Sequence, residues 1–134
     1  MATSPCQAAV PAYSALDSTT AIAAVLLKMA GAVSKNRPFV RDISDIFFNL
    51  KQRGFRFRDL GLRKIPGGYY SEDVEGFVGQ LLSLGYARQR SPIKLTENGR
   101  KFCEAIVREE NNQLEVAKLR EELESISQDG PATV

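Results

Sequence analysis

Positively charged side chains that could bind the phosphates of a nucleic acid gather in two stretches of the chain. In the first, residues 53–64, arginines alternate with phenylalanines, and the second spans residues 88–94. Arg and Lys at loop and hairpin positions neutralise phosphates without reading the base sequence. The alternative is an ordinary solvated surface, on which single cations need no function. The candidate DNA-binding cations are Arg56, Arg58, Arg63, Lys64, Arg88, Arg90 and Lys94.

An acidic segment lies between these two stretches. Glu72, Asp73 and Glu75 stand where a helix is expected to begin, and acidic side chains favour the positive end of a helix dipole. At a DNA-facing helix the same residues would repel phosphates, a cost that physiological salt screens only in part. This repulsion argues against a helix that recognises DNA sequence strongly. It does not exclude DNA binding, because an acidic side chain can accept a hydrogen bond from cytosine. The polar residues expected to face a groove from this region include Tyr69, Tyr70, Ser71 and Gln80.

Enzymatic chemistry has little support in the sequence. The chain contains no histidine, which excludes the Ser-His-Asp and Cys-His catalytic systems and the usual zinc ligand sets. Cys6 and Cys103 are isolated, and no phosphate-loop pattern occurs. We therefore expect a protein that is not an enzyme, with no catalytic residue, metal or cofactor. Cys103 is expected to be a small buried apolar residue in a helix.

Composition indicates one globular domain, and the charge is unevenly distributed. The 134 residues are 43% hydrophobic and 25% charged, with a net charge of only +2. Residues 1–101 hold fifteen Lys and Arg against eight Asp and Glu, whereas residues 102–134 hold three against eight. The apolar run from Ala21 to Leu27 is shorter than the roughly 20 residues that span a bilayer, and residues 1–17 do not resemble a signal peptide. We expect a cytoplasmic protein without a membrane partner.

The elements that must position these side chains follow from apolar spacing and from turn residues. We expect a flexible N-terminal arm over residues 1–16, then a helix over 18–33 and another over 40–53 that Gly54 ends. Residues 55–68 form a long connector in which Phe55 to Arg58 could be a short strand. A third helix is expected to begin at Ser71 and to end at Gly85, followed by two short strands within residues 86–95. Thr96 is expected to cap one last helix over residues 97–127, before a tail at 128–134.

This order is typical of a winged helix-turn-helix domain, here residues 17–101, in which the hairpin is the wing. The fold class expected is mainly α with a small β-hairpin and a long C-terminal helix. The segment GGYYSEDVEGFVGQLLSLGYARQRSPIKLTENGRKF, residues 67–102, resembles a stretch common to the small prokaryotic winged helix-turn-helix family of transcriptional regulators. The resemblance covers about a quarter of the chain closely. It implies a third helix in the major groove and a wing on the DNA backbone, although winged helices also serve as protein-interaction modules.

The expected last helix carries an apolar seam at heptad spacing. Glu109 and Asn112 interrupt the seam, which is otherwise apolar. We interpret it as the interface of a homodimer, with residues 102–127 as a C-terminal dimerisation helix in a short coiled coil. The alternative is that this face packs on the chain's own first helix. The interface residues predicted are Phe102, Ala105, Val116, Leu119, Leu123 and Ile126.

The sequence therefore predicts a homodimeric DNA-binding protein, with a role in transcription regulation, that contacts double-stranded DNA through its third helix, basic connector and wing. The competing interpretation, from a different functional class, is a winged-helix module that binds a protein partner and no DNA. The acidic start of the third helix favours this second interpretation.

Overall fold

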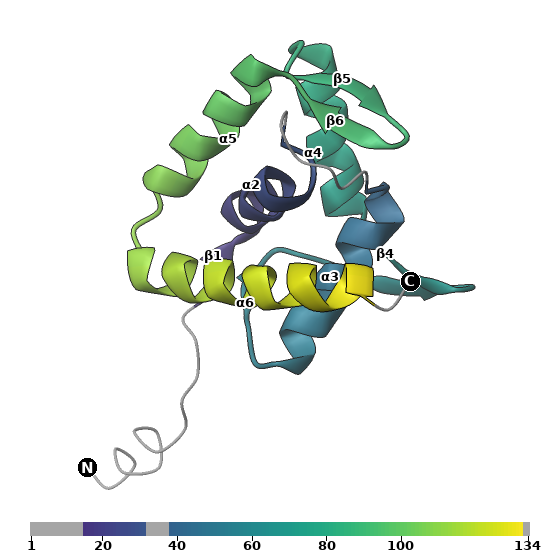
Figure 1. Ribbon diagram of the computed structural model, residues 1–134, viewed down its shortest axis with the longest axis vertical. Coiled ribbons are helices and arrows are strands. Elements are labelled where there is room, and N and C mark those ends of the chain that lie inside the picture. The colour runs from purple at the N-terminus through teal and green to yellow at the C-terminus, as the bar shows by residue number, and fades with distance from the viewer. Residues whose placement is uncertain (1–14, 32–37, 133–134) are drawn as a thin grey trace, which may run out of the picture.

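The computed structural model describes residues 15–31 and 38–132, with side chains up to residue 125. Over these residues the chain forms five helices and three two-stranded sheets (Figure 1). The elements in chain order are β1 (Leu16–Asp17), α2 (Ser18–Met29), α3 (Val40–Gln52), β2 (Phe57–Arg58), β3 (Arg63–Ile65), β4 (Gly68–Tyr70), α4 (Glu72–Ser83), β5 (Ala87–Arg90), β6 (Ile93–Leu95), α5 (Glu97–Arg108) and α6 (Gln113–Ala132). No helix among the described residues is long and apolar enough to cross a membrane.

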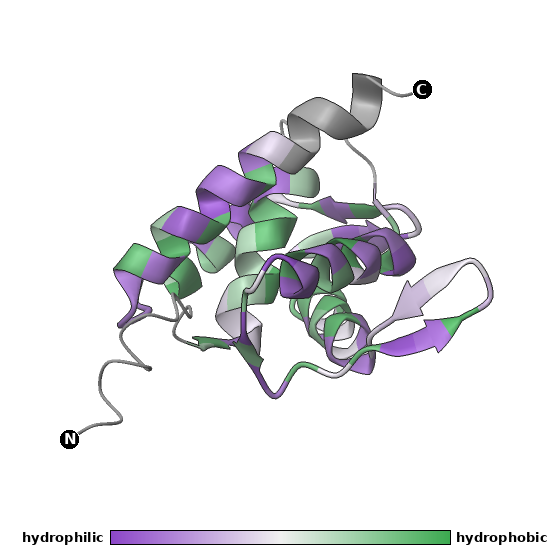
Figure 2. Cartoon of the chain, turned by 90° about the horizontal axis from the view of Figure 1, so that it is seen from below, coloured by the Kyte–Doolittle hydropathy of each residue, from purple (hydrophilic) through white to green (hydrophobic). Residues whose placement is uncertain are grey.

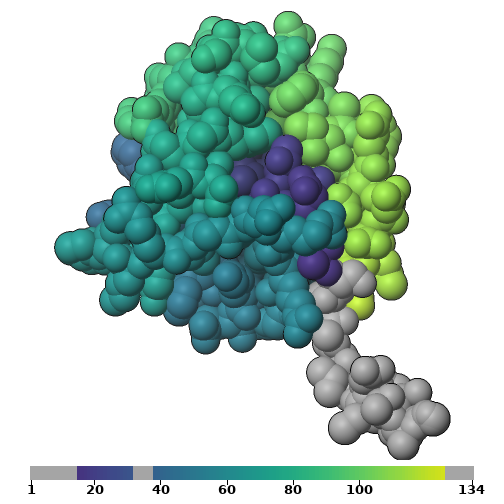
Figure 3. Space-filling view, turned by 180° about the vertical axis from the view of Figure 1, so that it is seen from behind, coloured from purple at the N-terminus to yellow at the C-terminus, as the bar shows by residue number. Residues whose placement is uncertain are grey.

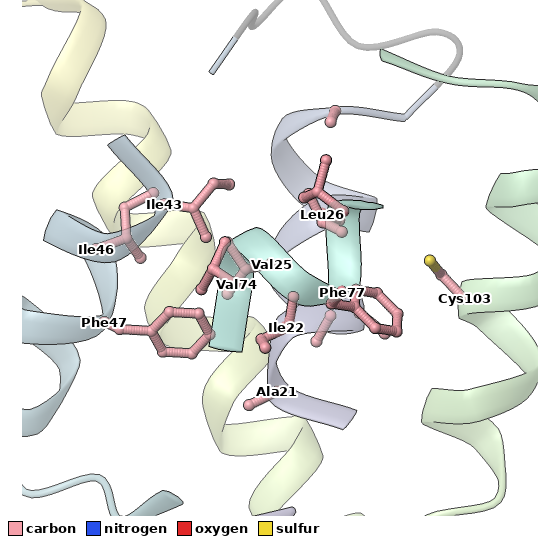
Figure 4. Packing of buried hydrophobic residues seen from close by; sticks show 14 of the residues in the cluster. Ala21, Ile22, Val25, Leu26, Ile43, Ile46, Phe47, Val74, Phe77 and Cys103 are labelled. Carbon is pink, nitrogen blue, oxygen red and sulfur yellow. The ribbon is translucent and has the colours of Figure 1, made fainter. Parts of the chain in front are cut away.

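Helix α2 is the centre of the molecule. Its residues from Thr20 to Leu26 are all buried, because neighbours cover it on every side. Helices α4, α5 and α6 and strands β1 and β2 all contact it. Figure 4 shows Phe47 of α3 and Phe77 of α4 beside α2, with Cys103 of α5 on the same core. The helix starts as predicted, because the Asp17 carboxylate accepts the Thr19 N–H at 3.1 Å.

The second helix and the connector after it largely follow the prediction. Ile43, Ile46, Phe47 and Leu50 are buried on one side of α3, and Gly54 ends that helix with a φ of 101°. The expected short strand is confirmed as β2, which pairs in parallel with β1.

The predicted boundary of the N-terminal arm is wrong, because Leu16 is buried in the core as part of β1. Residues 1–14 lie outside the described residues.

The connector also contains a β-hairpin that the sequence did not predict. Strands β3 and β4 pair antiparallel, with Arg63 opposite Tyr70 and Ile65 opposite Gly68. Pro66 and Gly67 form the turn, and Gly67 has a φ of 86°, a conformation that favours glycine. The prediction treated residues 55–68 as a connector and omitted the strands that flank this turn.

The third helix and the second hairpin are confirmed. Ser71 is the N-cap of α4, and Gly85 follows the helix with a φ of 79°. Strands β5 and β6 pair antiparallel, as expected for residues 86–95. Two further backbone hydrogen bonds tie β6 to the body: Leu95 N–H donates to Ala30 O at 3.0 Å and Ile93 N–H donates to Pro38 O at 2.7 Å.

The prediction of one long last helix is wrong, because the chain breaks between α5 and α6. The Gln113 side-chain amide donates to the carbonyl oxygens of Val107, Arg108 and Glu110 at 3.0, 3.0 and 2.7 Å, which stabilises the break at the end of α5. Helix α6 then runs back across α2 (Figures 1 and 2).

The assignment of the apolar seam to a dimer is also wrong. Val116, Leu119 and Leu123 are buried in the core of their own chain, as the alternative interpretation held. Phe102 stacks on Tyr86 with ring centroids 4.6 Å apart, and Ala105 is half-buried. The side chain of Ile126 lies outside those that the structure describes.

The residues that carry the family resemblance form a packing contact between α5 and the start of β5. Thr96 caps α5 by accepting the Gly99 N–H at 3.0 Å, and its hydroxyl donates to Gly85 O at 3.2 Å. Thr96 N–H donates to Tyr86 O at 3.0 Å. A Cβ on Gly99 would lie 1.8 Å from the same Tyr86 oxygen, so no larger residue fits there. These motifs therefore have a structural explanation.

Cys103 is the buried residue that the sequence predicted. Its side chain is fully enclosed, and burial raises the pKa of its thiol to about 12, because the thiolate would lose its hydration. Cys103 is therefore a packing residue.

Gly99→Ala should destabilise the protein by about 3 kcal/mol, because the added methyl overlaps a backbone oxygen. The matched control is Gly76→Ala on α4, where an added Cβ meets nothing within 4 Å and should stabilise the helix by roughly 0.5–1 kcal/mol. Urea unfolding of both variants measures the two effects, and equal effects would contradict the close contact.

Leu119→Ala should cost about 3 kcal/mol of folding free energy, because this side chain is 0% exposed. Leu114→Ala, on the same helix at 66% exposure, should change stability by less than about 0.5 kcal/mol. Thermal unfolding at several protein concentrations gives both values. If the loss for Leu119→Ala appears only at high concentration, the seam is intermolecular after all.

Candidate nucleic-acid interface

Two hairpins extend toward the same side of the molecule, and the first turns of α4 connect them. Figure 1 shows β3–β4 and β5–β6 both pointing to the right, and Figure 2 shows β3–β4 standing out from the body. The space-filling view in Figure 3 shows the teal part of the chain, which includes β3 and β4, projecting beyond the surrounding surface. The arrangement places most of the predicted cations on two projections.

The β3–β4 hairpin is held rigidly against α3. The Asp45 carboxylate accepts the backbone N–H of Tyr69 at 2.8 Å, and the rings of Phe48 and Tyr69 stack with centroids 3.9 Å apart. A Cβ on Gly68 would lie 2.8 Å from Asp45 Oδ1, so glycine permits this close approach. The hairpin is therefore a fixed projection.

The cations of this hairpin lie over its own tyrosines. Arg63 lies over the ring of Tyr70 and Lys64 over the ring of Tyr69, each at 5.0 Å from the centroid, and both cations remain exposed. Arg41, at the start of α3, lies close to the hairpin, since its Nη1 would be 3.6 Å from a Cβ on Gly67. The site prediction omitted Arg41, because only the folded chain brings α3 beside this turn.

The β5–β6 hairpin presents cations of two kinds. Arg88 is exposed and Lys94 half-buried, and neither has a carboxylate partner among the residues whose side chains are described. Lys94 stands opposite Gln89, whose side chain donates to Pro92 O at 3.0 Å. Arg90 differs, because it pairs with Glu75 of α4.

The acidic start of α4 has partners within the chain. Glu72 lies 3.8 Å from Arg63, and the Asp73 carboxylate accepts the Gly61 N–H at 2.7 Å. Glu75 pairs with Arg90 and accepts the hydroxyl of Tyr70 at 3.2 Å. These acids connect α4 to both hairpins and to the loop before β3, a role that the helix dipole alone did not suggest.

Several predicted site residues take other roles. The prediction that Ser71 faces a ligand is wrong, because its side chain is fully buried and accepts the Val74 N–H at 3.3 Å. Tyr69 and Tyr70 are half-buried, whereas Gln80 is exposed on α4.

Arg58 belongs to β2 and Arg56 directly precedes that strand, so neither lies on one of the two hairpins. Both are exposed, and Arg58 Nη1 donates to Ala15 O at 2.5 Å, while the Arg56 carbonyl accepts the Leu16 N–H at 3.0 Å. The sequence analysis grouped these residues with Arg63 because they are close in sequence. In the structure, the pairing of β2 with β1 positions them instead.

The surface of α4 between the hairpins is not basic. The helix sequence EDVEGFVGQLLS has no Lys or Arg, and a groove of about 280 Å³ beside it is lined by Ser18, Thr19, Ile22, Glu72, Asp73, Gly76, Phe77 and Gln80. Arg and Lys make the commonest specific contacts to guanine, so α4 is poorly equipped to read sequence.

In the part of the chain that the structure describes, no three His, Cys, Asp or Glu residues lie close enough together to hold a metal ion. Comparisons of the chain with protein-family models, curated proteins and solved structures find no match.

Asp45→Ala should loosen the β3–β4 hairpin, because the Tyr69 N–H loses its acceptor. Hydrogen exchange at the Tyr69 amide should accelerate by about tenfold, the factor that a loss of about 1.4 kcal/mol produces. Asp45→Asn is the control, since its amide oxygen can still accept the bond. Equal exchange in the two variants would show that the stacking of Phe48 on Tyr69 suffices.

Proposed function

We propose that the protein is a winged-helix DNA-binding protein that holds the phosphate backbone of duplex DNA with two hairpins. The observation that carries the proposal is that both hairpins extend to one side and present cations there. The β5–β6 hairpin would act as the wing, and the β3–β4 hairpin would act as a second phosphate-binding projection. Regulation of transcription is the role that this binding would serve.

Charge availability supports phosphate contact at these positions. Arg41, Arg88 and Lys94 have no carboxylate partner among the residues with described side chains, and the Lys64 ammonium lies over the Tyr69 ring. Such cations gain free energy from phosphates by releasing the counterions that surround DNA. The acidic residues of α6 lie elsewhere: Glu124 pairs with Lys28 and Glu122 with Arg53.

Helix α4 would contribute little base recognition in this arrangement. Its exposed side carries Gly76 and Gly79, where an added Cβ would meet nothing within 4 Å, and the uncharged Gln80. Binding that depends on phosphates alone is weakly selective for sequence. We therefore propose a protein with strong salt dependence and modest sequence preference. Both hairpins belong to one chain, so a single copy suffices for contact.

A protein-interaction module is the second candidate. The observation that favours it is the absence of any Lys or Arg on α4, together with Leu84 at 59% exposure where that helix ends. An exposed apolar side chain and a helix without cations suit a protein surface better than a phosphate backbone.

Replacing Arg88 and Lys94 by Ala together should weaken binding to random duplex DNA by about tenfold at low salt. The salt dependence of log K should become shallower by about 1.8, because each cation would neutralise one phosphate. Fluorescence anisotropy of a labelled duplex, titrated at several salt concentrations, measures both quantities.

The matched control for this variant is Lys51→Ala with Arg108→Ala, which removes two exposed cations at the ends of α3 and α5. This control should bind DNA with nearly unchanged affinity and salt slope. Equal losses in both double variants would indicate a nonspecific charge effect. A wild-type protein that binds no duplex at low salt, but forms a stoichiometric complex with another protein, would establish the second candidate.

A further inference from the structure

We propose that Glu75 neutralises Arg90 in the free protein and thereby limits the affinity for DNA. The inference rests on the proposed function and deepens it, because it assigns a regulatory role to one ion pair at the junction of the two hairpins. When a phosphate replaces the carboxylate as partner of Arg90, the guanidinium becomes part of the DNA contact.

A chain of contacts places Glu75 at this junction. Arg63 of β3 lies over the ring of Tyr70, the Tyr70 hydroxyl donates to Glu75 at 3.2 Å, and Glu75 pairs with Arg90 of β5. These four side chains run from one hairpin to the other across the first turns of α4. Any phosphate that contacts Arg90 therefore lies near Glu75.

The two members of the ion pair differ in freedom. The Glu75 side chain is 23% exposed and is held by Tyr70 as well as by Arg90, so its position is fixed from two sides. The Arg90 side chain is 51% exposed, near the tip of its hairpin, and its three methylene groups let it turn toward solvent. Arg90 can therefore change partner while Glu75 stays in place.

The exchange is energetically accessible but not neutral. Exposed ion pairs stabilise proteins only weakly, and guanidinium binds phosphate through paired, charge-assisted hydrogen bonds. The Glu75 charge remains beside the bound phosphate, however, and Glu72 lies one turn away on the same helix. Like charges a few ångströms apart repel even through water, so these acids oppose binding. Removing the charge of Glu75 should strengthen it.

Glu75→Gln tests this directly, because the Gln side-chain oxygen can still accept the Tyr70 hydroxyl and the side chain keeps its size. We expect affinity for a random duplex to rise about fivefold at low salt, because the released Arg90 guanidinium is then free to bind a phosphate. The salt dependence of log K should become steeper by up to about 0.9, because Arg90 then displaces counterions from one more phosphate. Fluorescence anisotropy between roughly 50 and 200 mM salt gives both quantities.

The matched control is Glu121→Gln, which removes one negative charge from an exposed position on α6. It should leave affinity and slope unchanged. A double-mutant cycle with Arg90→Ala identifies the mechanism. Arg90→Ala alone should weaken binding less than twofold, yet it should abolish most of the gain that Glu75→Gln produces.

Three results would overturn the inference while leaving the proposed function intact. They are a wild-type protein that binds DNA as tightly as Glu75→Gln, a gain that persists without Arg90, and an equal gain in Glu121→Gln. If neither the wild type nor Glu75→Gln binds duplex DNA, both proposals fail together. Should Glu75→Gln unfold, Glu75→Ala serves instead, because it also removes the partner of Arg90, and its affinity should rise by the same factor.

Discussion

Helix α2 carries apolar residues on every face, and the arrangement of the other elements follows from the need to bury it. Seven consecutive residues, Thr20 to Leu26, are buried, three of them alanines that let neighbouring helices approach closely. Packing on only two sides would leave part of the α2 surface exposed to water. Helices α4, α5 and α6 and the β1–β2 sheet therefore all pack on α2. Val116, Leu119 and Leu123 of α6 are buried in this way. The core therefore determines which surfaces remain for partners: the two hairpins, the outer side of α4 and the polar side of α6.

The sequence correctly predicted the elements that depend on residues close together in the chain. It failed for elements whose structure depends on contacts with distant residues. The apolar spacing of α3, the Ser71 and Thr96 caps and the β5–β6 turn all act within a few residues, and each is confirmed. The apolar heptad spacing of α6 is the same whether the helix packs on another chain or on α2. Spacing alone therefore could not distinguish a dimer interface from packing within the chain. The β3–β4 strands have three residues each, too few for alternation to show, and contacts with Asp45 and Phe48 of α3 stabilise them.

The same distinction applies to the candidate site. The sequence shows where the cationic side chains lie along the chain. Whether each one can bind a phosphate depends on which carboxylates lie beside it in the folded protein. Arg63 and Arg90 lie near acids of α4, whereas Arg88 does not. The motif around Gly99 shows the converse, since its residues make a close backbone contact with Tyr86. That motif is evidence about architecture, and the hairpin charges are the evidence about function.

The position of α2 in the chain has a consequence for synthesis on the ribosome. This helix is made first among the described helices, yet α5 and α6, which cover it, are made last. Until residue 123 has emerged, the Leu123 side chain cannot complete the cover, and the apolar surface of α2 stays accessible to chaperones or to other nascent chains. The N-terminal and C-terminal thirds must therefore meet late, across a large separation in sequence, which slows folding.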